Sequence, residues 1–296
     1  MNKVPTQVDG RFRLEDILGS GSYAVVYCAQ NFLNDDVVAI KLEPLTSHLS
    51  SVEHGVGIPC AIWFSRESTY HTMALELLGP SLHDLFKAHH RKFSLHTVVN
   101  LGEQLLSCLE HIHSYNYIHG DIKPQNVLLG LGDLSQTLFV VNFGITKKYW
   151  NAATETHIPF HQGQCLTGTP AFASINNHLG LEPGHHDDLK SLSYMLIYFM
   201  CGTLPWLTSS HEKLSSSDML ERKVDTTIAV LCDGVPSEFA NLLIYSRSLS
   251  FSEDPDYDYL HSLLHGLRTT ETLCPRNGPL PPSTTSAPHR KKKLTA

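Results

Sequence analysis

Four polar residues that could transfer a charged group lie within one stretch, residues 117–148. Asp121 is followed two positions later by Lys123 and five positions later by Asn126. The carboxylate can orient or accept the proton of a hydroxyl group, the amine can neutralise a phosphate, and the amide oxygen can hold a metal ion. Asn142 follows a β-type apolar run and could offer that ion a second amide. Residues of these types at this spacing are suited to chemistry on a phosphate group.

A glycine-rich turn and a lysine precede this stretch. Residues 11–42 predict three strands with a Gly-x-Gly turn over 19–24 and a polar turn before the third strand, 37–41. Such a turn lets backbone amides approach a phosphate without obstruction by side chains. Lys41 on a buried strand is costly unless an anion lies beside it, and nucleotide phosphates supply one.

Two helices are expected further along the chain. Ser94 is a suitable N-cap for an apolar-periodic helix that begins at Leu95, and Asp187-Asp188 leads an uncharged helix that extends to Cys201. An Asp at that position is compatible with a helix cap.

These motifs together resemble a known family. His119-Gly120-Asp121, Asn142-Phe143-Gly144 and Val38–Lys41 after a glycine turn resemble the catalytic, metal-binding and lysine motifs of eukaryotic protein kinases. From about residue 11 to 268 the chain looks like the casein kinase I family of Ser/Thr kinases. The motifs that carry this narrower likeness are Gly55–Pro59, Glu76–Leu82, Arg91–Leu95, Leu166–Thr169, Ala173–Asn176 and Pro236–Phe239.

The resemblance implies an α+β, two-lobed protein-kinase-like fold. It places a small β-rich N-lobe at about 11–77, with a truncated or missing helix C, and a larger, mainly helical C-lobe at about 78–268. Past that point the composition turns to Pro, Ser and Thr and ends in the basic run 290–293, so we expect residues 269–296 to be a disordered tail.

The resemblance also assigns roles at the site. Asp121 orients the acceptor hydroxyl, Lys123 meets the γ-phosphate, Lys41 meets the α- and β-phosphates, and Asn126 with Asn142 would hold Mg²⁺ or Mn²⁺. Residues 76–78 form the hinge whose backbone meets adenine. The residues expected to bind ATP are Leu18, Gly19, Ser20, Gly21, Ser22, Val26, Ala39, Lys41, Glu76, Leu78 and Leu128.

Several positions depart from the family pattern. Gly120 replaces an Arg, and Asn142 replaces the Asp whose charge fixes Mg²⁺, a hard cation that favours anionic oxygen. In the family, basic residues that recognise acidic substrates occupy three further positions. Here those positions hold Ala171, His185 and His186. The expected anion-guided substrate site is therefore eroded.

The segment after Lys41 is also short. Only residues 42–54 separate Lys41 from Gly55, too few for a full helix and its connections. The family's glutamate partner of Lys41 is therefore missing. Glu53 is the likeliest replacement within the segment, although a surface role suits it better, and Glu43, two residues along the strand, is expected to reach Lys41 poorly.

Two functions from different classes remain open. The chain could be a Ser/Thr kinase with impaired activity, or a pseudokinase that serves as a nucleotide- or partner-binding scaffold. Asp121, Lys123, Asn126 and Lys41 favour the first, whereas Asn142, the short segment after Lys41 and Ala171 favour the second. A missing piece of coding sequence after Lys41 would explain the gap but not Asn142.

The composition limits the number of domains and the kinds of partner that the chain could have. The 296 residues are 42% hydrophobic and 17% charged, ordinary for a soluble globular chain, and they allow one two-lobed domain or two small ones. No apolar run is long enough for a bilayer, and the start has no apolar signal-peptide core, so we expect an intracellular protein, cytoplasmic or nuclear. A net charge of −7 argues against nucleic acid. We expect a monomer that meets a protein substrate or partner.

Cysteine and histidine offer other chemistry. Seven cysteines are scattered without a Cys-x-x-Cys pair, which favours reduced thiols over disulfides or zinc. The 19 histidines include the adjacent pairs His89-His90 and His185-His186. Adjacent residues do not share a face, so we expect these pairs to be solvated surface histidines and not metal ligands.

Overall fold

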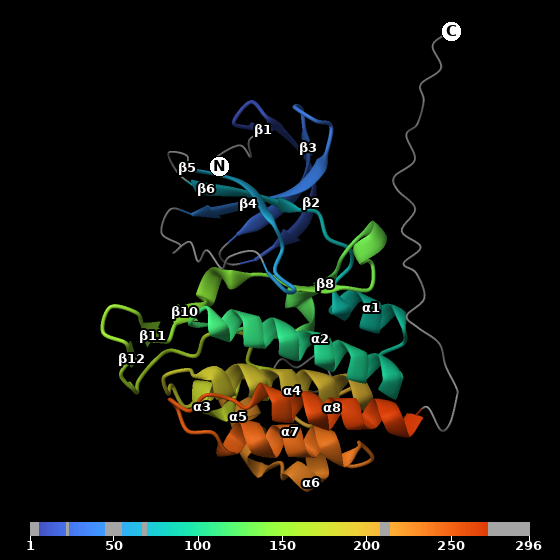
Figure 1. Cartoon of the computed structure of the whole chain (residues 1–296), viewed down its shortest axis with the longest axis vertical. Helices are drawn as coiled ribbons and strands as arrows, with labels where there is room; N and C mark the ends of the chain where they lie inside the picture. The colour runs from blue at the N-terminus through green and yellow to red at the C-terminus, as the bar shows by residue number, and fades with distance from the viewer. Residues whose placement is uncertain (1–5, 22–23, 45–54, 67–69, 208–213, 272–296) are drawn as a thin grey trace.

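The computed structural model describes residues 6–21, 24–44, 55–66, 70–207 and 214–271. It shows a small lobe built from a curled sheet and a larger lobe of helices beneath it (Figure 1). The predicted two-lobed α+β fold is confirmed. The expected truncation of helix C concerns residues 45–54, which lie outside the described residues.

The small lobe is a six-stranded antiparallel sheet in the order β1-β2-β3-β4-β6-β5. Its strands are β1 (Gln7–Val8), β2 (Phe12–Ser20), β3 (Val25–Asn31), β4 (Val37–Pro44), β5 (Ala61–Arg66) and β6 (Tyr70–Glu76). The three strands predicted over 11–42 are therefore confirmed. Val38 and Ile40 of β4 pack into the apolar core of this lobe, so Ala39 and Lys41 lie on the other face of the sheet.

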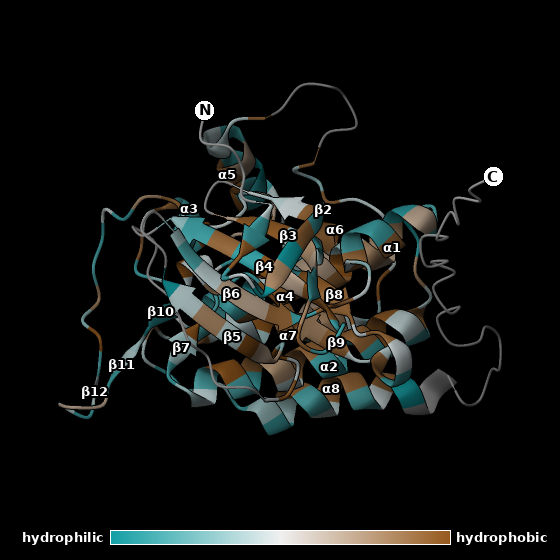
Figure 2. Cartoon of the chain, turned by 90° about the horizontal axis from the view of Figure 1, so that it is seen from above, coloured by the Kyte–Doolittle hydropathy of each residue, from teal (hydrophilic) through white to brown (hydrophobic). Residues whose placement is uncertain are grey.

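The large lobe is organised around one buried helix. Its helices are α1 (Leu82–Ala88), α2 (Leu95–Ser114), α3 (Ile175–His178), α4 (His185–Cys201), α5 (Ser216–Asp225), α6 (Ile228–Leu231), α7 (Ser237–Ser248) and α8 (Tyr257–Glu271). Every residue of α4 from His185 to Phe199 is buried. Seen from above (Figure 2), brown apolar residues concentrate in the central helices, whereas teal residues recur along α2 and α8. Ser94 caps α2 through Thr97 N, as predicted.

Short strands and 3₁₀ turns connect α2 to α3 and lie below the sheet of the small lobe. They are β7 (Tyr117–Ile118), β8 (Val127–Leu129), β9 (Leu138–Val140), β10 (Lys147–Lys148), β11 (Trp150–Asn151), β12 (Thr156–His157) and 3₁₀ turns at Pro124–Asn126, Gly132–Leu134 and Phe143–Ile145. The β8–β9 hairpin pairs Val127 with Val140. Because of this register, Asn126 and Asn142 flank the same end of the hairpin.

The turn at Gly55–Cys60 ties the sheet to the helical lobe. Gly57 has φ +67°, and a Cβ there would lie 2.0 Å from Cys108 Sγ on α2, so only glycine fits. Its carbonyl accepts a hydrogen bond from Val140 N at 2.8 Å, and Ile58 joins the large core. No described helix combines the length and apolar character that a membrane crossing requires.

Two expectations about the large lobe need correction. His185 and His186 are 1% and 5% exposed, so the prediction of a solvated pair is wrong for them. They begin α4, where His185 packs against Tyr149 with ring centroids 3.9 Å apart. The tail was expected from residue 269, but α8 continues to Glu271; the remainder lies outside the described residues.

Candidate active site

Asp121 stands at the centre of a compact polar cluster. Its Oδ1 accepts a hydrogen bond from Thr169 Oγ1 at 2.8 Å, and its Oδ2 lies 2.7 Å from Lys123 Nζ. Lys123 Nζ also donates to Thr169 Oγ1 at 2.6 Å. Asn126 Nδ2 donates to both the carbonyl and Oδ2 of Asp121, at 2.8 and 2.9 Å. The structure therefore brings together the carboxylate, amine and amide that the sequence singled out.

Asp188 of α4 holds the loop that carries Asp121. Its two carboxylate oxygens accept from His119 N at 2.7 Å and from Gly120 N at 2.8 Å. Burial opposes ionisation of Asp188, but hydrogen bonding and charge from His113 outweigh it and lower the pKa of this carboxyl below its ordinary value. Asp188 lies inside α4, after the Gly184 cap, so it braces the loop and does not cap the helix.

His119 connects this loop to the segment that follows β9. Its Nδ1 accepts from Asp121 N at 3.2 Å, and its Nε2 lies 3.1 Å from the carbonyl of Val141. Because Nδ1 accepts a hydrogen bond and Nε2 faces a carbonyl oxygen, we assign the neutral tautomer in which Nε2 carries the proton. Burial also lowers the pKa of His119, which agrees with a neutral ring. The ring packs edge-on against Phe143, so the two motifs are held as one unit.

Asn142 and Asn126 lie beside each other but form a poor metal site. Asn142 Nδ2 donates to Asn126 Oδ1 at 3.4 Å, while the other side of the Asn126 amide is taken up by Asp121. The described residues contain no cluster of three or more His, Cys, Asp or Glu placed to hold a metal. Mg²⁺ favours anionic oxygen, and the nearby Asp121 carboxylate is already shared by Lys123 and Thr169. This donor set does not fit Mg²⁺.

The conformation of Asn142 suits its residue type. It adopts φ 73° and ψ 58°, the left-handed region that Asn and Asp tolerate better than most residues. Gly120, in the place of the family's Arg, also has a positive φ, +79°. Both positions are therefore compatible with the residues found there.

Lys41 has a carboxylate partner on its own strand. Its Nζ forms an ion pair with Glu43 Oε1 on the same strand, contrary to the expected poor reach. Residues two apart on a strand point to the same face, so the two side chains need not cross the sheet. Glu53, the other candidate, lies outside the described residues.

The residues expected around a nucleotide line one face of the sheet and the strand below it. Val26 is opposite Lys41, and Leu75 is opposite Ala39, so these side chains share the face opposite to the small-lobe core. Leu18, Gly19 and Ser20 end β2, and Gly21 N donates to Ala24 O at 2.9 Å across the turn. Ser22 lies outside the described residues, and Leu128 is on β8.

The expected hinge follows β6 directly. Glu76 is anchored by Cys60: its N–H donates to the Cys60 carbonyl at 3.1 Å, and its Oε1 accepts from Cys60 N at 2.6 Å. In the described part of the chain the backbone N–H of Leu78 has no hydrogen-bond partner. Gly79 N then donates to Leu129 O at 2.8 Å, which closes the connection onto β8. An adenine edge could therefore meet the free donor of Leu78.

Thr169 ends the motif Leu166–Thr169, and the sequence predicts no role for its side chain. Its neighbour Gly168 explains the close approach, because a Cβ there would lie 2.6 Å from the Gly120 carbonyl. Lys223 of α5 supports the following residues: its Nζ donates to the carbonyls of Pro170 and Ala173 at 2.7 and 2.6 Å. A threonine beside a glycine does not by itself indicate a functional residue. Its contact with Asp121 joins residues far apart in the sequence, so sequence reasoning missed it.

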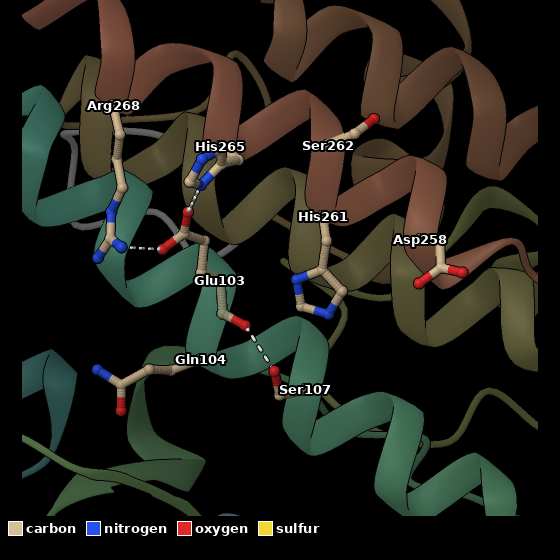
Figure 3. Close-up of a pocket in the computed structure, with 8 residues that line it drawn as sticks. All are labelled: Glu103, Gln104, Ser107, Asp258, His261, Ser262, His265 and Arg268. Atoms are coloured by element: carbon tan, nitrogen blue, oxygen red, sulfur yellow. Dashed lines mark hydrogen bonds and ion pairs between the residues drawn. The ribbon is translucent and has the colours of Figure 1, made fainter.

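A separate hollow lies in the groove between α2 and α8 (Figure 3). It has a volume of about 530 Å³. Arg268 forms an ion pair with Glu103 at 3.0 Å, and His265 Nδ1 lies 3.9 Å from the same carboxylate. None of its lining residues belongs to the Asp121 cluster. We interpret the groove as a polar joint between two helices and not as the reaction site.

Residues 12–244 match the family model described as protein kinase domain. The matched range covers strands β2 to β6 of the sheet, the β8–β9 hairpin that follows Asn126, and helix α4, which carries Asp188.

Proposed function

The chain belongs to the protein kinase family, and we propose that it is a casein kinase I-like Ser/Thr kinase that binds ATP and transfers phosphate slowly. Protein kinases in general use ATP and a divalent metal ion, and they act on proteins. The finer assignment rests on the motifs quoted above. The observation that carries the proposal is the intact cluster of Asp121, Lys123 and Thr169 beside the amide pair Asn126–Asn142.

The retained cluster supports transfer to a hydroxyl. Asp121 Oδ1 already accepts a hydrogen bond from the Thr169 hydroxyl, so it is placed to orient the hydroxyl of a substrate serine or threonine. Lys123 lies against the same carboxylate and would neutralise the charge of the transferring phosphate. Lys41 would meet the α- and β-phosphates, and the free N–H of Leu78 would meet adenine.

The amide pair supports a slow rate. Phosphate transfer depends mainly on positioning and charge, and the second loop ligand is neutral here. Replacing that carboxylate by an amide costs on the order of 3 kcal/mol of transition-state stabilisation, about a hundredfold in rate.

Recognition of acidic substrates also receives little support. Ala171 offers no charge where the family has Arg. Burial lowers the pKa of His185 to about 3 and also lowers that of His186, so this pair is neutral at physiological pH. We propose that residues 171, 185 and 186 do not select substrates by a negative charge on the substrate.

The second candidate is a pseudokinase that binds nucleotide or a protein partner without transferring phosphate. The specific observation in its favour is the hydrogen bond between Asn142 and Asn126, which uses the amide oxygen that a metal would need. In this case the cleft would serve binding alone.

Nucleotide binding tests the proposal. In a thermal-shift titration we expect ATP to raise the melting temperature by a small amount that depends little on Mg²⁺, because both loop ligands are neutral. No shift with ATP or adenosine at millimolar concentration would contradict the proposal. A large Mg²⁺-dependent shift would contradict the account of the metal loop.

A further inference from the structure

The ion pair between Lys41 and Glu43 is formed within a single strand. Both residues lie on β4, two positions apart, and their side chains are 13% and 8% exposed. β4 is paired on both sides: Lys41 is opposite Val26 of β3 and Met73 of β6. Among the described residues Glu43 is paired on one side only, opposite His71 of β6, and this pairing together with that of Lys41 fixes the direction of both side chains.

Burial makes the pair more than a surface contact. An ammonium group that loses most of its water is costly unless an anion compensates it, and Glu43 supplies that anion. An ammonium group has three donors, and one bond to Glu43 leaves two for other acceptors. Glu43 therefore orients the amine of Lys41, which keeps further donors for a phosphate.

We propose that Glu43 is the positioning residue for Lys41, in the place of the helix-borne glutamate that protein kinases supply after this strand. The inference rests on the proposed function, since it concerns the same nucleotide site. It accounts for a short segment after β4 without requiring a partner from residues 45–54. Glu43 acts through Lys41 and is not expected to touch the nucleotide itself.

The first test compares ATP with adenosine by isothermal titration calorimetry without added metal. Glu43→Gln keeps the shape of the side chain and removes its charge, so we expect ATP to bind about tenfold more weakly while adenosine affinity stays within about twofold. A merely structural role would weaken both ligands. Glu15→Gln, an exposed carboxylate on β2, and Glu53→Gln serve as matched controls and should bind ATP like the unmodified chain.

Combination with Lys41→Met sharpens this test. If Glu43 acts through Lys41, Glu43→Gln should weaken ATP binding no further in the Lys41→Met background. An equal loss for adenosine and ATP, an additional loss in the double variant, or a loss with Glu53→Gln instead would overturn the proposal. Tighter ATP binding by Glu43→Gln would also overturn it, because Glu43 would then be holding Lys41 away from phosphate.

A second measurement does not depend on nucleotide. Urea unfolding is measured for the unmodified chain, for Lys41→Met, for Glu43→Gln and for the double variant. Together they give the coupling between residues 41 and 43, which we expect to be about tenfold in the unfolding equilibrium constant. If the unmodified chain binds neither ligand, the proposed function fails. The coupling then decides this inference alone: a coupling within about twofold of none would overturn it.

Discussion

The side chain of Asn142 donates a hydrogen bond to Oδ1 of Asn126 at 3.4 Å. By the family resemblance we propose that these two residues occupy the metal-binding positions of a protein kinase, and in this structure their amides bond to each other. Asn126 is in turn tied to Asp121 through its other amide atom. On the proposed roles, the part of the site that would orient a hydroxyl keeps its carboxylate, whereas the part that would hold a metal offers two neutral amides.

Removing the brace on the Asp121 loop should unfold the large lobe more easily. Asp188→Ala leaves the N–H groups of His119 and Gly120 and one nitrogen of His113 without their acceptor. Because these groups are buried, we expect a loss of about 3 kcal/mol in the free energy of unfolding. Urea denaturation measures it, with the exposed Asp233→Asn as control. A loss equal to that of the control would contradict the bracing role.

Acid should destabilise the protein through His185. Burial lowers its folded-state pKa to about 3, whereas an unfolded histidine titrates near 6.5. Between these values the unfolded chain binds a proton that the folded chain does not, so stability falls as pH falls through this window. From pH 7.5 to 5 the loss from this residue is about 2 kcal/mol.

The variant His185→Gln isolates this effect. Unfolding free energies measured across pH 4 to 8 should show a shallower slope than those of the unmodified chain. His119 and His178 also have lowered pKa values and remain in both proteins, so the difference between the two curves is the readout. The exposed His96→Gln should leave the slope unchanged. Parallel curves for His185→Gln and the unmodified chain would refute the assignment.

Lys223 should matter for the segment that follows Thr169. Lys223→Met keeps most of the volume but removes the donor shared by the carbonyls of Pro170 and Ala173, and we expect a loss of about 2 kcal/mol in unfolding free energy. Limited proteolysis should then cut near residues 170–173 first. The exposed Lys148→Met provides the control, and equal resistance of the two variants to protease would count against this support.

Local motifs made much of this architecture predictable. The three strands over 11–42 and the cap at Ser94 follow from short patterns of apolar residues, glycine and serine. Asp121, Lys123 and Asn126 lie within one loop, so their meeting is also a local matter. Roles that depend on such neighbours can be assigned before the fold is known.

Other parts of the site depend on how the chain folds back. Thr169 reaches Asp121 across a long stretch of sequence, and nothing near it in the chain signals that contact. His185 is buried because its ring packs against Tyr149. The local sequence around His185 does not predict this contact. Glu43 is different: the alternation of a strand places it beside Lys41, and the rule that i and i+2 share a face could have found it.

The central claim is that the missing carboxylate at position 142 limits phosphate transfer. Radiolabel transfer to casein with Mg²⁺ tests it in the unmodified chain, in Asn142→Asp and in Asn142→Asp combined with Asp121→Asn. Aspartate tolerates the left-handed conformation found at position 142, so the variant should fold. We expect Asn142→Asp to raise the rate about a hundredfold and Asp121→Asn to abolish the gain. Rapid transfer by the unmodified chain, unchanged in Asn142→Asp, would contradict the claim.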